Sequence, residues 1–133
     1  RRNRKVKIRP LGCTFLLFNG KKSNTNRNKY YLDERNVSFP VIIRSRRPGD
    51  RLPMERGRKS LKKLFGEWHV PEEDRWMIPV VEDRNRIVGV LGRRFGYQDR
   101  FAPEVLCNTF ECKKVLVLEV SETGHPSEMN GDV

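Results

Sequence analysis

Apolar residues recur at the spacing of one helical face in a single segment of the chain. They occupy positions i, i+3, i+4 and i+7 and are Leu61, Leu64, Phe65 and Trp68. Ser60 precedes this stripe and suits the N-cap, because its hydroxyl accepts a hydrogen bond from a free backbone N–H. Pro71 suits the first turn of a second helix, and the acidic residues after it favour a helix N-terminus. We predict one helix from Ser60 and a shorter one that stops at Pro79.

Most other apolar residues form short runs bounded by turn residues, which is the pattern of strands. The predicted strands are 5–9, 14–18, 30–32, 37–44, 80–82, 86–91, 105–112 and 114–120. The last is almost continuously apolar, which predicts a central place in its sheet. Asn19-Gly20 predicts a hairpin turn, and Pro40 predicts either an edge strand or a bulge. The elements indicate an α+β fold: a small, mostly antiparallel, partly barrel-like β-sheet with one or two short helices.

The segment Arg47-Pro48-Gly49-Asp50 breaks the strand pattern before the first helix. Proline fixes its own φ angle, and glycine accepts backbone angles that other residues resist. A tight turn is therefore predicted between the strand that ends at Arg44 and the helix that follows Ser60.

Charge is distributed unevenly along the chain. The 133 residues carry a formal net charge of +11. Residues 1–63 hold 20 Lys and Arg against 4 Asp and Glu, a balance of +16, and residues 64–133 hold 8 against 13, a balance of −5. Such a surface attracts polyanions, so nucleic acid is the predicted partner. The alternative is a basic surface that only keeps the domain in solution.

No apolar run reaches the roughly 18 residues that a membrane-spanning helix needs. The longest runs are 15–18 and 115–118. The basic start is not followed by the long apolar region of a signal peptide. We therefore expect no membrane partner and a cytoplasmic location. The chain begins with arginine rather than methionine, which indicates a piece of a longer protein.

The cysteines and histidines predict neither a cross-link nor a metal site. Cys13, Cys107 and Cys112 are odd in number and include no C-x-x-C pair, so we expect small buried hydrophobic residues rather than a disulfide framework or a zinc knuckle. His69 and His125 stand apart from other ligands, whereas a zinc site needs three or four.

Motifs of catalysis are absent from the chain. There is no G-x-x-x-x-G-K-[ST] phosphate loop, no G-x-G-x-x-G, no G-x-S-x-G and no H-E-x-x-H. The paired carboxylates Glu72/Glu73 and Glu82/Asp83 match a helix start and a turn better than an acid–base pair. No active site is therefore identified in these residues, and the basic block is the remaining candidate site.

The densest positive charge lies beside the predicted turn and helix. The candidate nucleic-acid contacts in this block are Arg44, Arg46, Arg47, Arg51, Lys59, Lys62 and Lys63. Arginine presents a planar fork that donates two hydrogen bonds to phosphate, and lysine adds a point charge. The rigid turn and the anchored helix hold these cations in place. The alternative is that they are solvated, or paired with Asp50, Glu55 or the acidic second half.

A basic loop between two glycines adds Arg93 and Arg94 as candidate contacts. Aromatic residues follow among further arginines: Phe95, Tyr97 and Phe101. Rings in such a setting stack on unpaired bases or pack in the core, and the sequence leaves both possibilities open.

Four spaced runs occur in a fixed order along the chain. They are Arg44-x-Arg46-x-x-Gly49-Asp50-Arg51, Lys59-x-Leu61-Lys62-x-Leu64-Phe65, Val70-Pro71-x-x-x-Arg75-x-x-x-Pro79 and Ile87-Val88-x-Val90-x-Gly92. Together they resemble the C-terminal domain of the tRNA(Ile)-lysidine synthetase family. The resemblance is strong over residues 38–96, looser to Val120 and slight before Tyr30. We therefore expect a basic hairpin or linker region at 1–37 and a substrate-recognition domain at 38–120, and the polar composition of 121–133 predicts a disordered tail.

The resemblance implies a function for the parent protein. The family uses ATP, with Mg²⁺, to attach lysine to C2 of the wobble cytidine of an isoleucine tRNA with a CAU anticodon. In the family this chemistry belongs to an N-terminal catalytic domain with an S-G-G-x-D-S loop, which is absent here. The chain alone is then expected to be inert and without a cofactor. Its implied partners are the tRNA acceptor stem and the catalytic domain.

The family's basic positions match Arg44, Arg46, Arg51, Lys62 and Arg75 in this sequence, so the resemblance adds Arg75 to the candidate contacts. The acidic residues 72–74 offer Arg75 a structural ion pair instead. Two other functions stay open. The basic face could dock on an acidic surface of the catalytic domain or of a second subunit, or the domain could bind RNA without tRNA selectivity.

Overall fold

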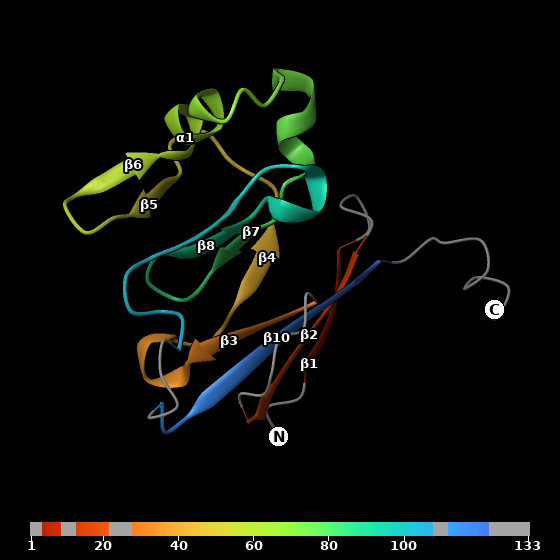
Figure 1. Ribbon diagram of the computed structural model, residues 1–133, viewed down its shortest axis with the longest axis vertical. Coiled ribbons are helices and arrows are strands. Elements are labelled where there is room, and N and C mark those ends of the chain that lie inside the picture. The colour runs from red at the N-terminus through yellow and green to blue at the C-terminus, as the bar shows by residue number, and fades with distance from the viewer. Residues whose placement is uncertain (1–3, 9–12, 22–27, 108–111, 123–133) are drawn as a thin grey trace, which may run out of the picture.

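The computed structural model describes residues 4–8, 13–21, 28–107 and 112–122 (Figure 1). Within these residues the strands form two four-stranded sheets and one two-stranded hairpin. Every strand pair is antiparallel. The predicted α+β class with a mostly antiparallel sheet is confirmed, and the described strands do not close into a barrel.

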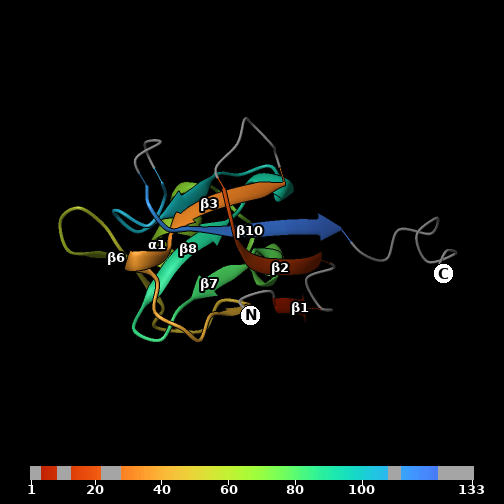
Figure 2. The same cartoon turned by 90° about the horizontal axis from the view of Figure 1, so that it is seen from below.

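The first sheet has the order β1-β2-β10-β3. Its strands are β1 (Arg4–Ile8), β2 (Cys13–Gly20), β3 (Lys29–Asp33) and β10 (Val115–Glu122). Figure 2 shows β10 between β3 and β2, so the predicted central position of this apolar strand is confirmed. The predicted turn at Asn19-Gly20 is wrong, because both residues continue β2 and pair with Leu116 and Val115. Pairing with a distant strand overrides the local turn preference.

The second sheet has the order β4-β7-β8-β9. Its strands are β4 (Ile42–Arg44), β7 (Val80–Glu82), β8 (Ile87–Leu91) and β9 (Asp99–Phe101). The predicted β7–β8 hairpin is confirmed, and the buried Asp83 carboxylate accepts hydrogen bonds from the Asn85 and Arg86 backbone N–H groups. β4 lies at the predicted edge but is shorter than 37–44, since it begins at Ile42. Before it, the Ser38 N–H donates to the Asp83 carboxylate, and Pro40 has no N–H to offer a neighbouring strand.

The helices follow the predicted pattern. α1 (Leu61–Glu67) starts at Ser60, whose hydroxyl accepts a hydrogen bond from the Lys63 N–H at 3.1 Å. The 3-10 helix η3 (Glu72–Met77) follows Pro71, as predicted, and two one-turn 3-10 segments are η2 (Glu34–Asn36) and η4 (Arg93–Phe95). The hairpin of β5 (Arg51–Pro53) and β6 (Arg58–Ser60) has no counterpart among the predicted strands. Its strands are too short to show an alternating pattern.

One hydrophobic core joins both sheets to α1. Its most buried large side chains are Phe15, Leu32, Leu52, Leu61, Leu64, Phe65, Ile78, Leu116 and Leu118. Trp68 is half-buried and packs on Phe65, with ring centroids 5.8 Å apart. β2, β3 and β10 all contribute to this cluster, so the core includes residues on both sides of the boundary predicted at residue 38. The division of the chain at residues 38 and 121 stays a prediction.

The strand predicted at 105–112 is wrong for residues 105–107, and residues 108–111 lie outside the described part. Residues 105–107 run beside β3 with only one isolated bridge, Leu32 to Leu106. The Asp33 N–H donates to the Val105 carbonyl at 2.7 Å, and the Cys107 N–H donates to the Tyr31 carbonyl at 2.8 Å. This segment therefore ties the two sheets together instead of adding a strand.

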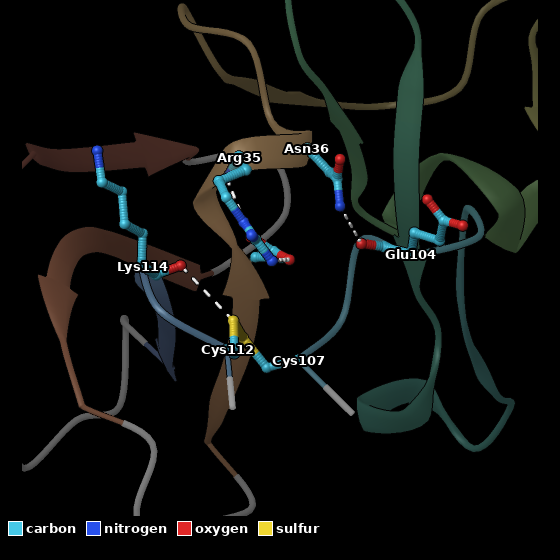
Figure 3. The surroundings of a disulfide bond; sticks show 7 residues. Arg35, Asn36, Glu104, Cys107, Cys112 and Lys114 are labelled. Atoms are coloured by element: carbon cyan, nitrogen blue, oxygen red, sulfur yellow. Dashed lines mark hydrogen bonds and ion pairs between the residues drawn. A yellow bond between two sulfur atoms is a disulfide. The ribbon is translucent and has the colours of Figure 1, made fainter. Parts of the chain in front are cut away.

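Cys107 and Cys112 form a disulfide (Figure 3). Their Cα atoms lie 5.7 Å apart, within the range that a disulfide spans. The expectation that the cysteines are only buried hydrophobic residues is therefore corrected for this pair. Cys107 is nevertheless buried, against Val115 and Val117 of β10, and the side chain of Cys13 lies outside the described residues. The two cysteines lie five residues apart in the chain, and their spacing and the odd cysteine count gave no indication of a cross-link.

We predict that Gly89→Ala lowers the free energy of unfolding. A Cβ at Gly89 would lie 2.6 Å from the Phe101 ring of the paired strand β9, and such overpacking costs about 1–3 kcal/mol. Gly66→Ala in α1 is the control, because nothing lies within 4 Å of its added Cβ, and it should gain up to about 1 kcal/mol. Urea unfolding measures both values. Equal stability of Gly89→Ala and the parent chain would contradict the close packing.

Candidate nucleic-acid interface

The predicted turn exists and is held by Asp50. The Arg47 N–H donates to the Asp50 carboxylate at 2.7 Å, and the Asp50 N–H donates to the Arg47 carbonyl at 3.1 Å. Gly49 takes a φ of 87°, the left-handed region that favours glycine. The turn leaves the Arg47 side chain exposed at the end of β4.

Arg44 lies next to this turn in a network of partly buried hydrogen bonds. Its guanidinium donates to Asp50 at 2.8 and 3.0 Å, to Glu82 of β7 at 2.9 Å and to the Ser45 carbonyl at 2.9 Å. The side chains of Arg44 and Asp50 are each only 10% exposed. The structure therefore gives Arg44 a role in holding the turn onto the second sheet.

The pKa values at this pair reflect the same contacts. The hydrogen bond to Asp50 raises the pKa of Arg44 above its ordinary value, against the opposing effect of burial. Burial alone would raise the pKa of Asp50, but hydrogen bonds from Arg44 and from the Arg47 N–H outweigh it and lower that pKa. Both groups are charged near neutral pH.

Arg46 and Arg75 meet over one acidic residue of η3. Arg46 donates to Glu72 at 3.0 Å, and Arg75 lies 3.5 Å from the same carboxylate. Arg75 is 13% exposed and also donates to the Val70 carbonyl at 3.0 Å. The predicted alternative for Arg75, a structural ion pair with the acidic residues before it, is thus present.

Three further candidates are also paired. Lys59 contacts Glu67 of α1 at 2.8 Å, and this hydrogen bond lowers the pKa of Glu67. Arg93 lies 3.7 Å from Asp99, and Arg94 donates to Asn28 at 2.9 Å and to the Val120 carbonyl at 3.1 Å. These contacts fix the loop after β8 to the ends of β9 and β10.

The remaining candidates are exposed and have no ion-pair partner within the described ranges. They are Arg47, Arg51, Lys62 and Lys63, and we call them the α1 basic surface. Arg51 pairs with Ser60 across the β5–β6 hairpin, and Lys62 and Lys63 begin α1 directly after Ser60. The Leu61 N–H donates to the Asp50 carbonyl at 3.0 Å, which joins the helix start to the turn of Arg47. The four cations thus lie on backbone segments that are hydrogen-bonded to one another.

Three arginines outside the predicted set also line a surface feature. Arg56 and Arg58 of the β5–β6 hairpin and Arg100 of β9 line one cavity. The arginines on either side of Gly57 could have marked these positions as candidates in the sequence. Without a predicted β5–β6 hairpin, however, nothing placed Arg56 and Arg58 near Arg100 of β9.

Other site types have no candidates in the described part of the chain. No group of three or more His, Cys, Asp and Glu side chains is placed there to hold a metal ion. No helix there combines the length and the apolar character that crossing a membrane requires.

Comparison with known proteins identifies relatives of the central region. A family model for the "TilS substrate C-terminal domain" matches residues 41–104. The tRNA(Ile)-lysidine synthase of Treponema pallidum (strain Nichols) is 42% identical over 65 residues, which are 49% of this chain and 14% of that protein. The enzyme of the same name from Geobacillus kaustophilus is 43% identical over 68 residues, covering 47% and 14%. The chain therefore spans about a seventh of these relatives.

A solved structure resembles the chain over most of its length. The crystal structure of a TilS C-terminal domain superposes with a TM-score of 0.66 at 25% identity, and the match covers 87% of this chain and 88% of that one. The bifunctional protein TilS/HprT of Listeria monocytogenes (serovar 1/2a) is 34% identical over 76 residues, 55% of this chain and 12% of that protein. The structural match reaches well beyond the residues that the family model covers.

Proposed function

Because this chain carries a TilS C-terminal domain, homologous to the C-terminal region of tRNA(Ile)-lysidine synthase, we propose that it binds the acceptor stem of isoleucine tRNA. The observation that carries the proposal is the α1 basic surface. Its four exposed cations lie on a turn, a hairpin and a helix start that are hydrogen-bonded to one another. Cations on a fixed support can follow the phosphates of a duplex.

Most of the proposed contact is to phosphates and 2′-hydroxyls, and a preference for the isoleucine stem would come from base edges in its shallow minor groove. The deep major groove of an A-form helix excludes side chains, so proteins bind RNA duplexes largely through phosphates and 2′-hydroxyls. The exposed arginines supply planar forks for phosphate oxygens, and the lysines supply point charges. The guanidinium groups of Arg44, Arg46 and Arg75 already donate to acidic residues or carbonyls. We therefore assign these three arginines to stabilising the turn and η3 rather than to contacting phosphate.

The parent protein would then be the lysidine synthase itself, acting in the cytoplasm on an isoleucine tRNA with a CAU anticodon. ATP and Mg²⁺ would act in its N-terminal catalytic domain, which carries the S-G-G-x-D-S loop in that family. The residues described in this chain are assigned no step of that chemistry. Their proposed part is to position the tRNA.

A competition titration tests the proposed specificity. We expect a minihelix with the acceptor stem of isoleucine tRNA to compete for the chain as well as the whole tRNA does, because the proposed contacts lie only on that stem. Methionine tRNA and its minihelix are the matched competitors. Equal binding of all four would instead support RNA binding without selectivity.

Docking on the catalytic domain is the second candidate function. It is favoured by two large apolar side chains on the surface, Ile42 at 49% and Trp76 at 48% exposure, since exposed apolar groups are common at protein interfaces. A docking domain would lose its affinity for tRNA once the catalytic domain is added. A tRNA-binding domain would keep it.

A further inference from the structure

The β5–β6 hairpin and the chain from β9 to residue 106 enclose a groove. In Figure 1 the hairpin projects from the body, and the cyan segment that contains β9 returns on the same side. Two adjoining cavities of about 530 and 460 Å³ share Glu55, Arg100, Phe101 and Pro103 in their walls. Each volume lies in the range of about 300–1,000 Å³ that is typical of small-ligand sites.

The hairpin side of the groove is positively charged. Arg56 and Arg58 line the larger cavity, are exposed, and have no ion-pair partner in the part of the chain that the structure describes. Lys59 lines the same cavity but is held by Glu67 at 2.8 Å, and Arg100 enters from β9. Two arginine forks are therefore available for an anion at this side.

The opposite wall offers a fixed aromatic ring. Phe101 lies directly over Gly89, where an added Cβ would meet the ring at 2.6 Å. Its ring centroid is 5.5 Å from that of Tyr30, and the Tyr30 hydroxyl donates to Asp99 at 2.8 Å. The ring is thus positioned by its neighbours and lines both cavities. Aromatic side chains of this kind stack with unpaired bases.

We propose that this groove binds one unpaired nucleotide of the RNA, with its phosphate on Arg56 and Arg58 and its base against Phe101. The inference rests on the proposed function, since it assumes that RNA is the ligand. A paired base in a duplex is stacked on both faces and has its pairing edge occupied, so it cannot enter a cavity of this size. A single-stranded extension beside the bound duplex can.

The one acidic side chain shared by both cavities gives the groove a base preference. Glu55 is exposed and lacks an ion-pair partner among the described residues. A carboxylate accepts a hydrogen bond from the exocyclic amine of cytosine, whereas uracil presents a carbonyl at that position. Cytidine is therefore favoured over uridine.

The test compares a blunt RNA hairpin, whose stem has the sequence of the isoleucine acceptor stem, with the same hairpin carrying a short unpaired 3′ tail of cytidines or uridines. We expect the cytidine tail to raise the affinity of the full chain by about tenfold, the effect of one stacked base. In Arg56→Ala/Arg58→Ala this gain should disappear while the blunt hairpin still binds. The control is Arg84→Ala/Lys113→Ala, which removes two other exposed cations and should keep the gain. Fluorescence anisotropy measures each affinity, and circular dichroism checks the fold.

The possible outcomes separate this proposal from the previous one. Binding of the blunt hairpin without any gain from the tail would overturn the groove and leave the proposed function standing. A gain that survives in Arg56→Ala/Arg58→Ala would place the unpaired nucleotide elsewhere and also overturn it. Equal gains from cytidine and uridine tails would overturn the role given to Glu55. No binding of any hairpin would overturn the proposed function, and the groove with it.

Discussion

Replacing Arg44 with alanine is expected to lower the free energy of unfolding by about 3 kcal/mol, because removal of one partner from a buried ion pair leaves the other charge without compensation. Arg44 and Asp50 are each 10% exposed, and the guanidinium also joins Glu82 and the Ser45 carbonyl. Among the described residues, the Arg47 N–H then remains as a donor to the Asp50 carboxylate. Urea unfolding followed by circular dichroism measures the loss.

Arg51→Ala is the matched control for this prediction. Arg51 is an exposed arginine just past the same turn, and removal of such a side chain changes stability by no more than about 0.5 kcal/mol. A double-mutant cycle of Arg44→Ala with Asp50→Ala isolates the interaction, and we expect a coupling energy above roughly 1 kcal/mol. Additive effects in that cycle would show that the ion pair does not stabilise the fold.

The second large effect is expected at the α1 basic surface. Alanine at Arg47, Arg51, Lys62 and Lys63 should weaken tRNA binding by more than about tenfold. The log–log salt slope should fall by about 0.9 for each phosphate that is no longer neutralised, or roughly 3 to 4 units for all four cations. The side chains are exposed, so the fold should survive. Anisotropy titrations over a series of salt concentrations give both values.

A charge-matched variant separates local binding from general attraction. Alanine at Lys21, Arg84, Lys113 and Lys114 also removes four exposed cations and lowers the formal net charge from +11 to +7. Arg84 lies in the β7–β8 turn, after the last residue of β7. Arg44 pairs with Val80, the first residue of β7, so Arg84 lies at the opposite end of this strand. If the salt slope fell equally in both quadruple variants, tRNA would be attracted by net charge alone and the α1 basic surface would have no special part.

These two predictions divide the basic residues into two kinds. Arg44, Arg46 and Arg75 have acidic or carbonyl partners and support the turn and η3. The α1 basic surface presents its charge outward. Loss of tRNA binding in an Arg44 variant would therefore follow from a displaced turn, whereas loss in an Arg51 variant would follow from a missing cation.

Several features of this protein were determined by the sequence alone. The stripe of Leu61, Leu64 and Phe65 predicted α1, and each of these residues is buried. The apolar run near the C-terminus predicted the central strand β10, and the spaced motifs indicated the family whose model matches residues 41–104. These features are readable because periodicity and turn chemistry act between residues close in the chain.

Only the tertiary structure decided which basic side chains have acidic partners and which segments distant in the sequence lie side by side. Arg44 meets Glu82, 38 residues away, and the Asn19-Gly20 pair is drawn into β2 by β10. The groove likewise needs the β5–β6 hairpin and β9, two segments about forty residues apart in the sequence. Such pairings depend on the packing of distant segments around one core, and no local pattern in the sequence encodes them.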